Sequence, residues 1–129
     1  MNTITRTAAG LGTALALAVP TALVAAAPAH ADVERRGACG AGQYELSVDR
    51  EDGGYEVSAD IDRVAPGSRW RVVLRHDGQR IARVVRRADH EGDLDVDRQR
   101  PNTSGRDVFR FRAKRLGHST SCSARVSVG

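Results

Sequence analysis

The residues with the clearest chemical potential are basic side chains at alternate positions of two short, otherwise apolar segments. They are Arg69, Arg71, Arg75, Arg110, Arg112 and Lys114. Alternate residues of a β-strand lie on one face of a sheet, and guanidinium groups bind carboxylate or phosphate through paired hydrogen bonds. The pattern therefore indicates a basic face able to bind an anionic polymer. A merely solubilising face, whose charges discourage edge-to-edge sheet pairing, is the simpler interpretation, and the residue pattern alone favours it.

Three aspartates at alternate positions form a second candidate. Asp93, Asp95 and Asp97 resemble the start of an acidic calcium loop. Such a loop continues with a glycine and ends in a bidentate glutamate, but Arg98 and Ser104 occupy those positions. On a strand the three carboxylates are spread too far apart to surround one ion. We therefore expect a solvated strand face and no metal site.

The histidines His76, His90 and His118 complete the reactive residues of the region after the leader. None has the close histidine or acid spacing of a zinc site. No segment resembles a nucleophile elbow, and so short a chain leaves little room for a deep pocket. The sequence therefore predicts no catalytic residues, no metal and no cofactor, and a small secreted hydrolase is the least favoured function.

The first 31 residues have the features of a secretory signal peptide. Arg6 precedes an apolar stretch over residues 8–27, and Ala29-His30-Ala31 fits a small-x-small cleavage site. Pro20 and Pro28 argue against an uncleaved membrane anchor, which is the alternative. We expect cleavage after Ala31, a secreted protein, and no membrane span in the mature chain. Removal of residues 1–31 from the 129-residue chain leaves 98, enough for one domain.

Two cysteines, Cys39 and Cys122, lie near opposite ends of the predicted mature chain. In an oxidising compartment the expected state is one disulfide between them. The alternative, a reactive or metal-binding thiol, has no adjacent histidine or acid pattern to support it. The net charge of the whole chain, +4, is too modest to indicate nucleic-acid binding by itself.

Alternation of apolar and polar residues predicts seven short strands and no helix after the leader. The strands are expected at 44–49, 55–62, 69–76, 79–87, 93–97, 109–114 and 121–128. Residues 32–42 are charged and glycine-bearing, and we expect an N-terminal arm there. The predicted fold is an all-β, seven-stranded, immunoglobulin-like β-sandwich over residues 43–129.

In a sandwich of this type, strands one, two and five form one sheet and the other four strands form the second. The outward residues then separate by charge. The first sheet would carry Glu45, Asp49, Glu56, Asp60, Asp62, Asp93, Asp95 and Asp97. The second would carry Arg69, Arg71, Arg75, Arg110, Arg112, Lys114 and Arg125. If acidic and basic strands were neighbours instead, the same residues would form cross-strand ion pairs.

Asp77-Gly78, between the third and fourth strands, predicts a β-hairpin with a two-residue turn. The register set by that turn pairs Leu74 with Ile81, Val72 with Arg83, and Trp70 with Val85. It directs Arg83 to the core side, where its stem would lie over Trp70 and its head reach water. A three-residue turn would instead pair Leu74 with Ala82 and Val72 with Val84.

With the strands placed, the chain resembles a group of small secreted actinobacterial β-sandwich proteins with no assigned activity. The resemblance depends on Cys39, on the segment 70–74 with its Asp77-Gly78 turn, on Gly105-Arg106-Asp107, and on Gly117 with Cys122. It implies an immunoglobulin- or fibronectin III-like architecture and says nothing about activity. Cys39 lies too far before Trp70 for the core disulfide of an antibody domain.

The function predicted from the sequence is a secreted, non-enzymatic binding module whose basic sheet face engages an anionic cell-envelope or extracellular polymer. Nucleic acid is a disfavoured partner, because Trp70, Phe109 and Phe111 point inward and leave no aromatic residue on that face for base stacking. The alternative is a carrier of small ligands, or an inhibitor, that uses loops at one end of the sandwich.

Overall fold

The computed structural model describes Gly12 and residues 33–129, so the predicted leader and its cleavage site after Ala31 lie outside the described residues. The described chain forms eight strands and no helix, so it has no helix able to cross a membrane. The strands are β1 Val33–Cys39, β2 Gly42–Glu51, β3 Gly54–Asp62, β4 Arg69–His76, β5 Gln79–Arg87, β6 Leu94–Pro101, β7 Asp107–Arg115 and β8 Ser121–Val128.

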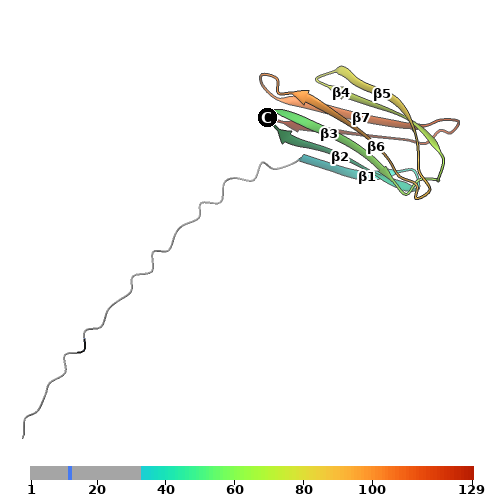
Figure 1. Cartoon of the computed structure of the whole chain (residues 1–129). Coiled ribbons are helices and arrows are strands. Elements are labelled where there is room, and N and C mark those ends of the chain that lie inside the picture. Colours follow the sequence, from blue (N-terminus) through green and yellow to red (C-terminus); the bar gives the residue numbers. More distant parts are fainter. Residues whose placement is uncertain (1–11, 13–32) are drawn as a thin grey trace, which may run out of the picture.

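The strands form two four-stranded antiparallel sheets that lie face to face (Figure 1). Their orders are β1-β2-β3-β6 and β5-β4-β7-β8. The predicted division of the seven strands between two sheets is therefore confirmed. The strand count is one too low, because residues expected as an arm form β1, whose seven residues all pair with β2.

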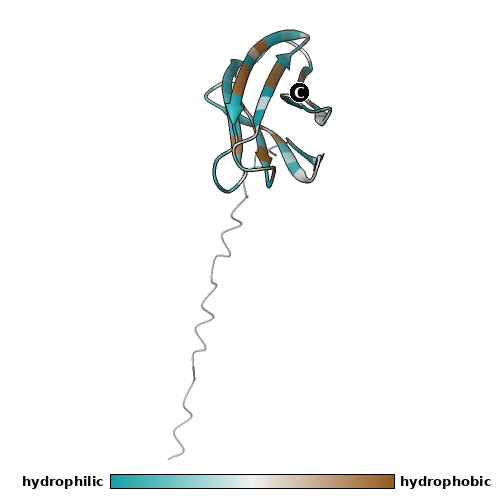
Figure 2. Ribbon diagram, turned by 90° about the vertical axis from the view of Figure 1, so that its right-hand side faces the viewer, coloured by the Kyte–Doolittle hydropathy of each residue, from teal (hydrophilic) through white to brown (hydrophobic). Residues whose placement is uncertain are grey.

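The core lies between the two sheets and follows the predicted alternation. Figure 2 shows hydrophobic blocks along the strands interrupted by hydrophilic ones. The largest fully buried side chains include Trp70, Phe109 and Phe111, all from the second sheet, and they pack with aliphatic residues of the first. Aligned sandwiches bury the inward faces of both sheets in this way, which leaves both outer faces to solvent.

The β4–β5 hairpin has the predicted two-residue turn, since His76 pairs with Gln79 across Asp77-Gly78. Both turn residues have positive φ, +48° and +82°, as a type I′ turn requires. The predicted register is nevertheless wrong. A β-bulge between Leu74 and Arg75 shifts the pairing, so Leu74 opposes Ala82, Val72 opposes Val84 and Trp70 opposes Arg86.

The bulge determines the direction in which Arg83 points. In a strand, a shift of one residue moves each side chain to the other face. Arg83 opposes Val73 and is exposed, on the outer face of the sheet and not on the core side as predicted. A bulge two residue pairs beyond the turn thus adds a cation to the outer face and leaves Ala82 and Val84 towards the core.

The disulfide between Cys39 and Cys122 is present and joins the end of β1 to the start of β8, so it links the two sheets. Its cysteines are 83 positions apart. In chain-entropy models, closing a loop of this length stabilises the fold by about 4–5 kcal/mol.

We therefore expect the double variant C39A/C122A to lose about 4 kcal/mol of unfolding free energy in guanidinium titrations. The reduced wild-type protein is the matched control and should lose a similar amount. A loss below about 1 kcal/mol in both would show that the fold does not depend on this link.

Candidate functional site

The outer face of the second sheet carries an unbroken row of arginines, one from each strand. Arg75 of β4 pairs with Arg80 of β5 on one side and with Arg110 of β7 on the other, and Arg110 pairs with Arg125 of β8. Adjacent strands lie about 4.8 Å apart. The four guanidinium groups therefore span about 14 Å of the sheet, perpendicular to the strands.

Two further rows extend this basic face along the strands. The next row is Arg83, Val73, Arg112 and Ser123, and the one after it is Val85, Arg71, Lys114 and Ser121. Each row contributes two cations. The short serine side chains of β8 lie beside the much longer side chains of Arg112 and Lys114 on β7. We call the basic residues of the three rows the basic face: Arg71, Arg75, Arg80, Arg83, Arg110, Arg112, Lys114 and Arg125.

The basic face has no internal charge compensation. Among the residues that the structure describes, no side chain of this face forms an ion pair, and the one hydrogen bond shown goes from Arg75 to the Gly78 carbonyl, at 3.2 Å. Like charges directly opposite each other on neighbouring strands destabilise a sheet. The same cations placed next to acidic strands would have stabilised it, so this arrangement has a cost that an anionic ligand would relieve.

Two shallow hollows indent the basic face and share Val73, Arg75 and Arg112. One has a volume of about 320 Å³ and is bounded by cations of β4, β5 and β7. The other, about 570 Å³, extends over β7 and β8 and includes Ser123 and Arg125. Val73 thus gives an apolar floor between flexible guanidinium groups, a surface suited to an extended ligand.

Five of the six cations predicted from the sequence lie together on the basic face, namely Arg71, Arg75, Arg110, Arg112 and Lys114. Arg69 is on the same side of β4 but lies at its far end, opposite Arg87, and lines neither hollow. Sequence reasoning missed Arg83 because the bulge reverses the parity of β5 between Arg80 and Arg83. Arg80 was also omitted, although the predicted two-residue turn already places it opposite Arg75.

The outer face of the first sheet is acidic in the same systematic way. Glu45 of β2, Asp60 of β3 and Asp95 of β6 form a row across three strands, and Asp97 lies one row further along. Arg36 of β1 pairs with Glu45 at 2.7 Å. Partial burial and neighbouring carboxylates, Asp62 first among them, raise the pKa of Asp60 to about 6. The predicted separation of charge between the two sheets is therefore present.

The raised pKa of Asp60 has a consequence for stability. An acid whose pKa is higher in the folded state holds its proton longer when folded, so its ionisation destabilises the fold as pH rises from about 4 to about 6. We expect Asp60→Asn to raise the unfolding free energy at pH 7 by roughly 0.5–1 kcal/mol after screening by solvent, and to change little at pH 3.5. Thermal melts at the two pH values measure this, with Ser58→Ala as the control, and equal effects at both would contradict it.

A buried polar cluster lies at the end of the sandwich next to the Asp77-Gly78 turn. Asp107 Oδ1 lies 2.6 Å from His76 Nε2, and Tyr55 Oη donates to Asp107 Oδ2 at 3.0 Å. Thr103 also donates to Asp107. Arg100 Nε donates to His76 Nδ1 at 3.3 Å. Burial opposes ionisation of Asp107, but these hydrogen bonds outweigh it and hold its pKa below the usual value.

Arg100 fixes the tautomer of His76. An arginine side chain has only donors, so Nδ1 accepts and the ring proton is on Nε2, which donates to Asp107. The ring is also stacked on Phe109, with centroids 4.3 Å apart. His76 and Asp107 fall on the inward positions of β4 and β7, so their parity with Leu74 and Phe109 was the signal that could have identified them.

His76, Asp77 and Asp107 could be regarded as a metal site, since one ligand atom from each lies within 4.8 Å of the others. The hydrogen bonds do not fit that role. Metal binding needs a lone pair on Nε2, which would move the ring proton to Nδ1 and against the Arg100 donor. The side chain of His76 is 1% exposed, which also denies a substrate access to it. The cluster is a structural link between the sheets.

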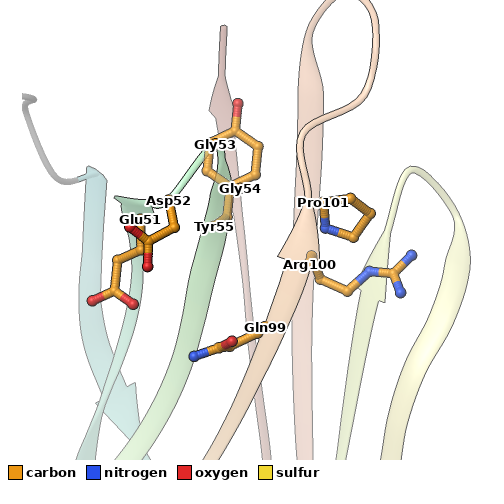
Figure 3. Close-up of a pocket in the computed structure, with 8 residues that line it drawn as sticks. All are labelled: Glu51, Asp52, Gly53, Gly54, Tyr55, Gln99, Arg100 and Pro101. Atoms are coloured by element: carbon orange, nitrogen blue, oxygen red, sulfur yellow. The ribbon is translucent and has the colours of Figure 1, made fainter.

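Arg100 connects this cluster to a surface hollow of about 350 Å³ at the β2–β3 turn. Figure 3 shows the Arg100 side chain on the side of the β4–β5 hairpin, away from that of Glu51. Glu51 and Asp52 lie on the turn, and Tyr55 lies between it and β6. The side chains of Arg100 and Tyr55 are both hydrogen-bonded within the buried cluster. We therefore interpret the hollow as a result of how these residues close the end of the sandwich, and not as a binding site.

No protein-family model, no curated protein and no solved structure matches the chain significantly.

Proposed function

We propose that the chain is a secreted, non-enzymatic binding module whose basic face holds an anionic polymer outside the cell. The observation that carries the proposal is the row of four arginines across the second sheet, with no acid opposite any of them. A polymer lying across the strands would meet one guanidinium about every 4.8 Å. Each guanidinium can make paired hydrogen bonds to phosphate, sulfate or carboxylate.

The shape of the face favours a polymer over a single small anion. The two hollows are open and shallow, and they divide the cations among four strands. An extended ligand contacts many of these groups at once, and each contact releases counterions. The large aromatic residues of this sheet, Trp70, Phe109 and Phe111, are buried, so the basic face has no stacking platform for nucleic-acid bases. Acidic polysaccharides and phosphate-linked polymers of the cell envelope fit this chemistry better.

Export and an immunoglobulin-like type of sandwich are part of the same proposal. A disulfide that joins the two sheets is consistent with an oxidising compartment. The resemblance to secreted actinobacterial sandwiches points in the same direction. The alternative, a small-ligand carrier or inhibitor acting through end loops, has no comparable observation in its favour.

Retention on heparin and on phosphocellulose tests the proposal. Elution from both matrices above roughly 0.1 M salt is expected, because several guanidinium contacts together survive that degree of screening. Elution below this salt concentration would contradict polymer binding and would indicate that the basic face serves only to keep the protein soluble.

A further inference from the structure

The two outer faces of the sandwich are opposite in charge and match in spacing. The acidic row places Glu45, Asp60 and Asp95 on three adjacent strands. The arginine row places its members on four adjacent strands of the other sheet. Because every sheet has a strand spacing of about 4.8 Å, a carboxylate row laid over an arginine row brings one acid opposite one guanidinium at three successive strands. The fourth position of the acidic row is Arg36 of β1, so the fourth arginine of the other row would lie beyond the edge strand β6, past Asp95.

Each face is also electrostatically frustrated when alone. Neighbouring carboxylates oppose the ionisation of Asp60, and among the described residues neither Asp60, Asp95 nor Asp97 forms an ion pair. The basic face lacks acids entirely. Within one molecule the basic face and the acidic face point in opposite directions, since the core lies between them. At the β5–β6 edge, Arg86 and Arg87 line a hollow with Asp95 and Asp97, but neither arginine belongs to the basic face.

We infer that the acidic outer face of the β1-β2-β3-β6 sheet docks a second copy of this chain through that copy's basic face. The contact is heterologous, because two different surfaces meet, and it leaves an acidic face and a basic face free at the ends of the pair. Heterologous contacts of this kind extend into open stacks when the rotation does not close a ring. Aligned packing of sheets at about −30° permits the same geometry between molecules as within one.

The size of the contact sets its strength. Four strands of eight residues cover about 19 Å by 24 Å, or roughly 450 Å² on each partner. A total near 900 Å² is at the low end for protein interfaces, so the association is transient and salt-sensitive, with a dissociation constant on the order of 100 µM at low salt. A polyanion competes for the basic face, so polymer binding and stacking exclude each other at each contact.

The acidic residues separate this inference from the proposed polymer binding. Asp60→Asn, Asp95→Asn and Asp97→Asn, combined, remove the three carboxylates that form no ion pair, leave only Glu45 paired with Arg36 in the acidic row, and keep the basic face intact. R75Q/R110Q/R125Q removes three of the four charges of the arginine row and leaves the acidic face intact. The acidic-face variant should keep wild-type affinity for heparin yet lose self-association, whereas the basic-face variant should lose both.

The decisive experiment is sedimentation velocity of the disulfide-bonded protein, expressed with its leader in a secreting host, at about 0.5 mM protein and about 20 mM salt. The wild type should form species beyond the dimer that disappear at about 0.5 M salt. Each triple variant alone should be monomeric. An equimolar mixture of the two variants should form 1:1 dimers and nothing larger, because only one acidic face and one basic face remain to meet.

Three outcomes would contradict the inference. One is a monomeric wild type at low salt, and another is self-association that persists in the acidic-face variant. The third is a mixture that stays monomeric while the wild type associates. Heparin retention of the wild type measures polymer binding independently of self-association. A failure of stacking can therefore be distinguished from a failure of polymer binding.

Discussion

The triple variant R75Q/R110Q/R125Q should bind heparin about 100-fold more weakly than the wild-type protein at low salt, a loss of roughly 3 kcal/mol. The three arginines occupy adjacent strands of one row. A charge-assisted hydrogen bond contributes about 1.5–3 kcal/mol in a dry site, and exposure reduces this to about 1 kcal/mol for each residue. Glutamine is shorter but also polar, and these side chains are exposed, so the change removes charge with little change in packing.

The matched control removes three exposed arginines from other parts of the molecule. R35Q/R63Q/R106Q changes β1, the segment after β3 and the loop before β7, and it lowers the net charge by the same amount. If binding follows net charge alone, both variants should weaken equally. The proposed row predicts a change of less than about threefold for the control, since distant exposed charges are screened. Isothermal titration with a heparin fragment of defined length measures both.

Asp107→Asn should destabilise the fold by about 3–5 kcal/mol. The carboxylate accepts hydrogen bonds from His76, Tyr55 and Thr103, and its side chain is fully buried. An asparagine keeps the shape but replaces one acceptor oxygen with an NH₂ group, which then faces a donor. Buried groups left without a partner cost the full desolvation penalty.

Asp97→Asn on the acidic outer face is the control and should change stability by less than about 0.5 kcal/mol. The pH dependence supplies a second readout. Because the folded state lowers the pKa of Asp107, its stabilisation is complete above the unfolded value near 3.9 and is lost as pH falls through the folded pKa. Urea titrations should show the gap between wild type and Asp107→Asn narrowing below pH 4, and a constant gap would contradict the assigned hydrogen bonds.

Much of the fold was predictable because period-two alternation is a local property of a strand with one buried face. The runs from Tyr55 to Asp62 and from Phe109 to Lys114 show it without interruption, and both are strands in the structure. β1 was missed for a physical reason. It is an edge strand with Glu34, Arg35 and Arg36 in succession, and edge strands commonly carry such charges to prevent further pairing.

The basic face was predictable in its position and only partly in its membership. Arg110 and Arg112 follow the alternation of β7 directly. The outward orientation of Arg83 depends on a bulge. No residue of the hairpin predicts that bulge, since Ile81 and Ala82 are compatible with either register. The buried cluster was missed because it joins residues of four strands and a loop. His76 and Asp107 acquire a shared role only when β4 and β7 are paired and the end of the sandwich is closed.

The salt dependence of heparin affinity tests the central claim most directly. A plot of log affinity against log salt for the wild type should have a slope near −3 or steeper, since each ionic contact contributes about −0.7 to −0.9. R75Q/R110Q/R125Q should flatten that slope by about 2, whereas R35Q/R63Q/R106Q should leave it unchanged. Equal slopes for the two triple variants would show that the arginine row is not where the polymer binds.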